Sequence, residues 1–242
     1  MTRVALVLVA ACAACTTTAA ADAGAPGASV RVAQLSADLP GKTDVCLLRA
    51  GEALLGGPVA RGVGAAWIQR GQVTRAVDVA SGPAAVRVVA AGTSSCGNGL
   101  QPDLPVVIPA GRSTVVVAGV IAGDAAHPLV ALVVPDDPPA LALGVRAVNV
   151  DAAAPTVDVG VVCAGAFAGE AAAYGAVGAY RDAPFADCTP TARLPGQATD
   201  YAHTSARATA AAGTFHTAYV FGGRIILCDD APTAEPLASC VE

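Results

Sequence analysis

Cysteine is the residue type in this chain whose number and spacing point most clearly to chemistry. The 242 residues include eight cysteines, two of which follow an apolar N-terminal stretch. The other six are widely spaced, and none forms a pair at the roughly two-to-four-residue spacing of a structural zinc site. An even number of distant cysteines favours disulfides formed in an oxidising compartment. The six are Cys46, Cys96, Cys163, Cys188, Cys228 and Cys240.

The order of these cysteines suggests a pairing. Cys46 and Cys96 are the only two of the six in the first half of the chain, so we expect them to bond to each other. For the second half we favour Cys163–Cys188 and Cys228–Cys240, although the spacing also permits other connectivities. Each bridge is expected to add about 2–4 kcal/mol of stability by restricting the unfolded chain.

Histidine and serine give little support for catalysis. The three histidines, His127, His203 and His216, have no partner at metal-ligand spacing, and we expect them on the surface or on edge strands. The chain contains neither a G-x-S-x-G nucleophile elbow nor a G-x-x-x-x-G-K-[ST] phosphate loop. We therefore predict no catalytic, cofactor-binding or metal-ligating residue and no cofactor.

Two pairs of adjacent carboxylates, Asp136-Asp137 and Asp229-Asp230, follow or end apolar runs. Paired carboxylates could contribute to a calcium site, but neighbouring side chains on a strand point to opposite faces. Only one member of each pair can then face a given site, and we interpret both pairs as polar strand ends or turns. Asp44 and Asp158, each beside valine, are expected on a solvent face or as turn caps.

Two aromatic residues, Trp67 and Tyr180, occupy matching positions in a chain with only 4% aromatic residues. Such residues could stack on sugars or lie in an interface. More often they anchor the core of a sandwich, and that is the role we expect for both.

The N-terminus resembles an export signal. Residues 1–15, MTRVALVLVAACAAC, combine one arginine, an apolar stretch and small residues, which is the pattern of a secretory signal. The run ending at Cys12 also resembles a bacterial lipobox, which predicts lipidation of Cys12, with Cys15 as the alternative. An ordinary cleaved signal, and hence a secreted protein, is the competing interpretation. Residues 16–28 have no periodicity and are predicted to be a flexible tether.

The segments that carry these residues are predicted to be short strands. Runs rich in valine alternate with turn signals, and the chain contains 26 glycines and 17 prolines. Strands of this length and spacing are typical of an all-β sandwich or barrel. The small share of charged residues, 14%, and the abundance of glycine and proline argue against a helical bundle or a disordered chain.

The chain also repeats itself, which predicts two tandem immunoglobulin-like β-sandwich domains. Six landmarks recur in the same order: Pro40, Gly62, Trp67, Gly82, Gly111 and Asp136-Asp137 correspond to Pro155, Gly175, Tyr180, Gly196, Gly213 and Asp229-Asp230. We place the two copies at residues 29–140 and 141–232, each of ordinary sandwich size, with a C-terminal tail at 233–242.

The openings of the two copies resemble the bacterial "domain of unknown function 4397" family. A typical copy in that family opens with R-V-V-H-A-S-P-D-A-P-A-V-D-V. Residues 146–159, RAVNVDAAAPTVDV, fit this pattern without a gap, and residues 31–40, RVAQLSADLP, fit it in part. The family's histidine is Gln34 in one copy and Asn149 in the other. The resemblance implies a sandwich-like fold at the cell surface, but no activity.

These observations predict a non-enzymatic, exported lipoprotein that acts as a binding or spacer module of the bacterial cell envelope. Its partners would be the membrane, through the N-terminal lipid, and a protein or glycan ligand. The net charge of −5 argues against nucleic acid. The alternative is an exported carbohydrate-active or metal-dependent enzyme with a site between the two domains.

Overall fold

A computed structural model describes residues 27–121, 127–136, 143–154, 156–163, 166–182, 188–204, 214–230 and 235–240. Regular structure in these residues is almost entirely β-strand, and the helix among them, α1 (Val59–Gly62), has only four residues. The all-β fold predicted from the sequence is confirmed. The predicted signal, the anchor candidates Cys12 and Cys15, and most of the predicted tether lie outside the described residues.

The first half of the chain forms two facing sheets. The first inner sheet contains, in spatial order, β10 (Val130–Pro135), β9 (Gly111–Ala118), β1 (Gly27–Gln34) and β5 (Gln72–Thr74), with β6 (Val77–Ala80) also paired to β1. The first outer sheet contains β3 (Glu52–Ala53), β2 (Lys42–Arg49), β7 (Gly82–Ala90) and β8 (Leu104–Ile108), with β4 (Ile68–Gln69) also paired to β2. Valines that alternate along these strands fill the space between the two sheets.

The second half repeats this arrangement. The second inner sheet contains β18 (Arg224–Asp229), β17 (Thr214–Phe221), β11 (Leu143–Asn149) and β14 (Arg181–Asp182). The second outer sheet contains β13 (Ala166–Ala173), β12 (Thr156–Cys163), β15 (Thr189–Arg193) and β16 (Asp200–His203). In both halves the first strand pairs in parallel with a late strand, β1 with β9 and β11 with β17. The shared strand order agrees with the internal duplication inferred from the sequence.

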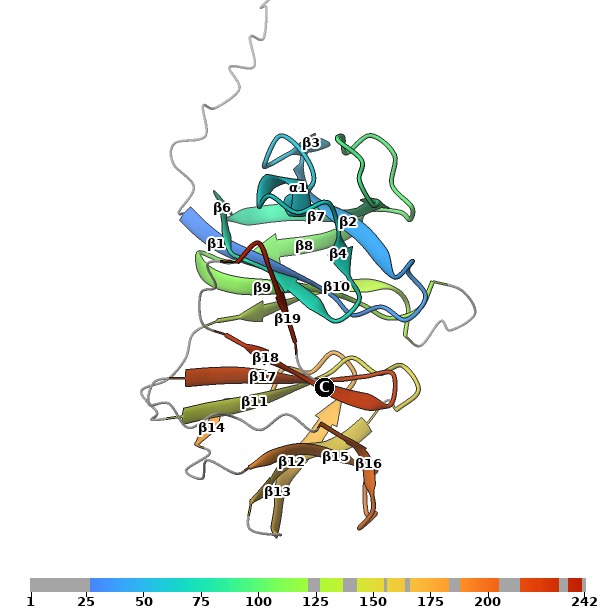
Figure 1. The fold of residues 1–242 in the computed structure, drawn as a ribbon, viewed down its shortest axis with the longest axis vertical. Helices are drawn as coiled ribbons and strands as arrows, with labels where there is room; N and C mark the ends of the chain where they lie inside the picture. Colours follow the sequence, from blue (N-terminus) through green and yellow to red (C-terminus); the bar gives the residue numbers. More distant parts are fainter. Residues whose placement is uncertain are drawn as a thin grey trace, which may run out of the picture.

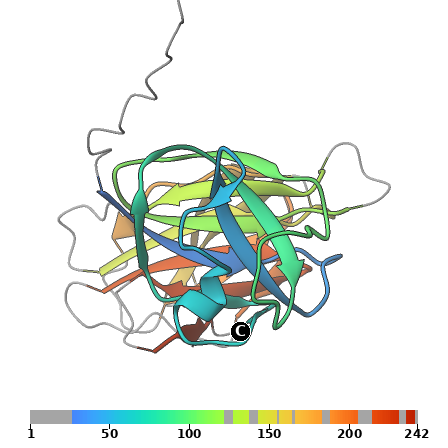
Figure 2. The ribbon, with the colours of Figure 1, turned by 90° about the horizontal axis from the view of Figure 1, so that it is seen from above.

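The four sheets stack as layers, with the two inner sheets packed face to face in the middle (Figure 1). Seen from above, the strands of successive layers overlie one another (Figure 2). Residues of both inner sheets form one buried cluster, which includes Leu35, Val116, Val148, Tyr219 and Ile226. Because the inner strands are covered on both faces, they need apolar residues on both faces, which explains continuous runs such as residues 115–118, VVVA.

The cores of the two halves differ in side-chain size. The core of the first half contains Leu39, Leu47 and Ile68. At its centre the second half relies more on alanine, including Ala172, Ala192 and Ala218. Small side chains fill the space between sheets less completely, and a small cavity lies between the two sheets of the second half.

The predicted C-terminal tail contains a short strand that returns to the first half. Strand β19 (Leu237–Ser239) pairs with β5 and extends the first inner sheet. The backbone amide of Cys240 donates to the carbonyl of Gly71 at 3.2 Å. The end of the chain therefore fastens the second half to the first.

Candidate functional site

The most concentrated group of charges lies buried between the two inner sheets. Asp136 accepts from the guanidinium Nη2 atoms of both Arg31, at 3.1 Å, and Arg146, at 2.8 Å. Arg31 also reaches Asp230, at 3.1 Å. All four side chains are at most 4% exposed. We call these residues, Arg31, Asp136, Arg146 and Asp230, the interface cluster.

Hydroxyl groups add hydrogen bonds to the interface cluster, in which the buried Nε atom of Arg31 has no hydrogen-bond partner. The Thr114 hydroxyl donates to Asp136 at 3.1 Å, and the Thr217 hydroxyl donates to Asp230 at 2.8 Å. Thr217 in turn accepts from Nε of Arg146 at 2.8 Å. The Tyr180 hydroxyl donates at 3.0 Å to Oδ2 of Asp230, the same oxygen that accepts from Thr217 at 2.8 Å. Two arginines and two aspartates thus neutralise each other, with their carboxylate oxygens engaged inside the chain.

Burial shapes the electrostatics of the interface cluster. Burial raises the pKa of Asp230 above its ordinary value, and it outweighs the opposing attraction of Arg146 and Arg31. Burial opposes the charge of Arg31, but the nearby Asp136 and Asp230 carboxylates prevail and raise the pKa of that guanidinium. Burial, followed by the Asp230 charge, raises the pKa of the Tyr180 hydroxyl. The interface cluster therefore joins strands of both inner sheets through charged groups that are buried from solvent.

The interface cluster follows the duplication of the chain. In the parallel pairs, Arg31 lies beside Thr114 on β1 and β9, and Arg146 lies beside Thr217 on β11 and β17. Asp136 and Asp230 each follow the next antiparallel strand. Structurally, Asp136 therefore corresponds to Asp230, and the landmark alignment of Asp136 with Asp229 is shifted by one residue.

The predicted role of the carboxylate pairs, as polar strand ends or turns, describes where Asp136 and Asp230 lie but not the arginine contacts that they make. Asp229 is exposed, whereas Asp230 points into the interface cluster, so one member of this pair faces a buried site as the alternation rule requires. The missed partners were Arg31 and Arg146. A detectable signal was present, because each arginine opens the R-V or R-A-V segment at the start of its copy.

Asp44 also differs from its expected place on a solvent face. Its side chain is fully buried, and its Oδ1 accepts from the backbone amides of Val45, at 2.7 Å, and Ala60, at 2.8 Å. From within β2 it thereby satisfies a backbone amide in the first turn of α1, a role that neither the solvent-face nor the turn-cap expectation describes. Burial raises the pKa of Asp44 despite these hydrogen bonds. Its counterpart Asp158 is half-buried.

Trp67 and Tyr180 are half-buried, and the prediction that they anchor the cores was wrong. Each aromatic ring instead carries a cation on its face. The Lys42 ammonium lies 4.4 Å from the Trp67 ring, and the Arg146 guanidinium lies 4.5 Å from the Tyr180 ring. Both half-buried rings therefore have one face in contact with a cation, an arrangement that adds a modest electrostatic attraction.

The three histidines lie apart in different environments. The His127 ring meets the edge of the Tyr174 ring, with centroids 4.7 Å apart. His203 is exposed, and His216 is buried with no hydrogen-bond partner for its Nε2 atom. Within the described ranges, no group of three or more histidine, cysteine, aspartate or glutamate side chains is arranged to hold a metal ion.

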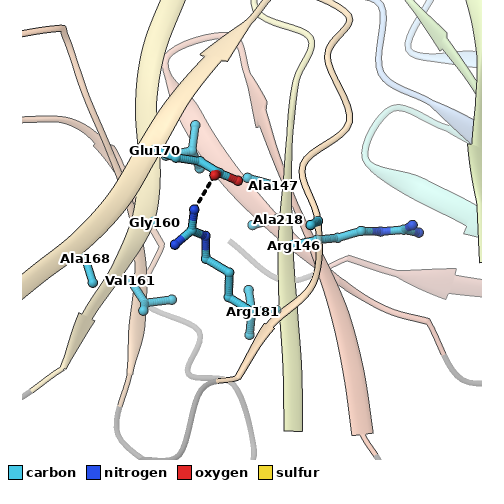
Figure 3. A pocket seen from close by; sticks show the side chains of 11 residues that line it. Arg146, Ala147, Gly160, Val161, Ala168, Glu170, Arg181 and Ala218 are labelled. Atoms are coloured by element: carbon cyan, nitrogen blue, oxygen red, sulfur yellow. Dashed lines mark hydrogen bonds and ion pairs between the residues drawn. The ribbon is translucent and has the colours of Figure 1, made fainter. Parts of the chain in front are cut away.

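A small cavity lies between the second inner and second outer sheets (Figure 3). Its volume is about 30 Å³, which suits a single water molecule. An ion pair between Arg181 of β14 and Glu170 of β13 lies at the cavity, and both side chains are partly exposed (Figure 3). The side chain of Arg146 points away from it (Figure 3). The other walls are largely apolar: Val145, Ala147, Val159, Val161, Ala168 and Ala218.

The six cysteines pair as predicted. Cys46–Cys96 joins β2 to the loop before β8, and Cys163–Cys188 links the end of β12 to the residue before β15. Cys228–Cys240 joins β18 to the residue after β19. The last bridge therefore reinforces the return of the C-terminal strand to the first half.

Gln34 and Asn149, which occupy equivalent positions in the two halves, both donate side-chain hydrogen bonds to backbone carbonyls. The Gln34 amide donates to the Pro40 carbonyl at 3.3 Å. The Asn149 amide donates to the carbonyls of Ala154, at 2.9 Å, and Ala172, at 3.1 Å. Both side chains are fully buried. Each brings the end of the first strand of its copy together with the loop that follows.

Comparison with other proteins adds no further constraint. Among the described residues, no helix has the length and apolar character required to cross a membrane. Neither the protein-family models nor the curated proteins include a match to this chain.

Proposed function

We propose that the protein is a non-enzymatic, exported lipoprotein of the bacterial cell envelope, and that it acts as a stiff spacer or binding module. Export is supported by the signal-like residues 1–15 and by three disulfides, which form and persist in oxidising compartments. We further propose that Cys12, or alternatively Cys15, carries the lipid, and that the chain is related to the "domain of unknown function 4397" family.

One observation carries the spacer proposal: the two inner sheets share a single buried core. Apolar residues from both halves fill this core, and the interface cluster links the halves at its polar part. Large apolar interfaces limit relative domain motion, so the two halves would act as one rigid unit beyond the predicted tether. The alternative, an exported carbohydrate-active or metal-dependent enzyme, would have its site between the two halves.

Fractionation of bacteria that express the full chain tests the anchor. The wild-type protein should be found in the membrane fraction, and its N-terminal peptide should carry the mass of a diacylglycerol. Cys12→Ala should lose this modification, whereas Cys15→Ala should keep it. The reverse result would assign the lipid to Cys15, and release of unmodified wild-type protein into the medium would contradict the lipoprotein proposal.

Activity assays test the non-enzymatic part of the proposal. The purified protein should not cleave envelope glycans, with or without added divalent metal ions. If cleavage were observed and Glu170→Gln abolished it, the carbohydrate-active enzyme would replace the spacer as the better account.

A further inference from the structure

A second cavity opens at one end of the interface between the two inner sheets. Its volume is about 170 Å³, close to the roughly 150 Å³ of an apolar protein cavity that binds benzene. Leu35, just after β1, and Val150, just after β11, line it together with Phe221, the last residue of β17. We call it the end cavity.

Both copies contribute to the end cavity through corresponding residues. Leu35 of the first copy corresponds to Val150 of the second, and Ala37 corresponds to Ala152. Leu35, Val150 and Phe221 also belong to the buried cluster that joins the inner sheets. The end cavity is therefore continuous with the apolar core, and it requires both halves of the chain.

Two glycines with positive φ, Gly119 and Gly222, line the end cavity. Gly119 has φ +95°, and a Cβ atom there would lie 2.2 Å from the Pro128 carbonyl oxygen. Gly222 has φ +58°, a conformation that disfavours most side chains. Neither position accepts a larger residue without strain, and Ala37 and Ala152 are too short to fill the space. At these four wall positions the chain therefore carries either no side chain or only a methyl group, which leaves the space unfilled.

Polar groups around the end cavity are already engaged. The Ser36 hydroxyl donates to the Gly119 carbonyl at 2.7 Å. One carboxylate oxygen of Asp151 accepts from the Gly223 amide at 2.7 Å and from the Tyr201 hydroxyl at 3.1 Å. The other accepts from the Ala153 amide at 3.0 Å. Among the described residues that line the end cavity, the side chains therefore offer no free donor to an anion and little to hold water.

We propose that the end cavity is a binding site for a small, uncharged, apolar molecule about the size of benzene or toluene. Burial of such a molecule would replace poorly bonded water and extend the core between the inner sheets. The proposal does not depend on where the protein resides, so its failure would leave the export proposal intact.

Fluorine NMR on the purified protein tests the ligand class. The chain should carry Cys12→Ala and Cys15→Ala, so that no detergent is needed that could itself fill the cavity. Fluorobenzene should bind saturably, and unlabelled toluene should displace it. Benzoate at the same concentration should not displace it, because its charge would be desolvated without a partner. No saturable binding at millimolar concentration, or equal displacement by benzoate, would overturn the proposal.

Two variants locate the site. Ala152→Leu and Ala37→Leu each place a larger side chain on one wall of the end cavity, and each should weaken fluorobenzene binding at least about tenfold. The matched control is Ala171→Leu on the exposed face of β13, which should leave binding unchanged. Circular dichroism would establish that each variant is folded. Unchanged binding in either folded cavity variant would rule out this site.

Discussion

Buried charge is the main feature at the level of single residues. Asp44, Asp136 and Asp230 are all nearly inaccessible to solvent, and their oxygens are satisfied in two different ways. Asp44 accepts from backbone amides, whereas Asp136 and Asp230 pair with arginines. Burial of an unpaired charge is costly, so removal of one partner of these aspartates should lower the free energy of unfolding strongly.

The first prediction concerns Asp230→Asn. The variant leaves Arg31 and Arg146 with less negative charge to balance them, and loss of one partner of a buried ion pair costs about 3–5 kcal/mol. We expect a loss of that order in the free energy of unfolding, measured by urea denaturation. The control is Asp229→Asn, because the adjacent carboxylate is exposed and should contribute much less. Equal losses in both variants would contradict a special role for the interface cluster.

The second prediction concerns pH and Asp44. Because burial raises its folded-state pKa, the folded protein binds more protons than the unfolded chain between the ordinary carboxyl pKa and the raised one. This contribution is fully present below that window and is lost as the pH rises through it. Relative to Asp44→Asn, the wild-type protein should therefore gain stability as the pH falls, as measured by denaturation at several pH values.

The control for this pH dependence is Asp78→Asn, at an exposed carboxylate of the same half. Its stability should follow that of the wild-type protein across the same pH range. A constant difference between the wild-type protein and Asp44→Asn at every pH would show that Asp44 titrates alike in both states.

At the level of elements, the inner strands and the C-terminal strand decide how the halves are joined. Strands β1 and β9 are buried on both faces, which suits their parallel pairing. Strand β19 extends the first inner sheet from the far end of the chain, and Leu237 packs against the core of the first half. The Cys228–Cys240 bridge fixes this strand to β18.

The third prediction concerns that bridge. Replacement of both cysteines, Cys228→Ala with Cys240→Ala, removes a cross-link with a sequence separation of 12 residues and should cost about 3 kcal/mol. Hydrogen exchange should also accelerate in β5, because β19 would no longer be held against it. The double variant Cys163→Ala with Cys188→Ala serves as control and should leave exchange in β5 unchanged. Protection of β5 that survives loss of Cys228–Cys240 would show that strand pairing alone retains β19.

At the level of the whole molecule, the stack of four sheets is held together in its middle layer. The cluster between the inner sheets draws residues from both halves, so disruption of one half should be transmitted to the other. This coupling can be measured because the chain has a single tryptophan, Trp67, which lies in the first half. Its fluorescence reports on that half alone.

The fourth prediction uses this reporter. Ile225→Ala truncates a fully buried side chain in the core of the second half and should cost about 2–5 kcal/mol. If the halves unfold together, the transition followed by Trp67 fluorescence should shift to lower urea by the same amount as the transition followed by circular dichroism. Leu194→Ala, at an exposed site in the second half, should shift neither. An unchanged Trp67 transition in Ile225→Ala would mean that the halves unfold independently.

From the amino-acid sequence one can predict the strands and the repeat and can favour one pairing of the cysteines, although their spacing leaves other pairings open. Valine-rich runs and glycine turns are local signals, and duplication is visible as recurring landmarks. The tertiary structure decided which charges meet, since Arg31 and Asp230 are 199 residues apart and come together only because the inner sheets pack face to face. The cavities were equally invisible in the sequence, because empty space depends on how neighbouring sheets fit and not on the spacing of residues along the chain.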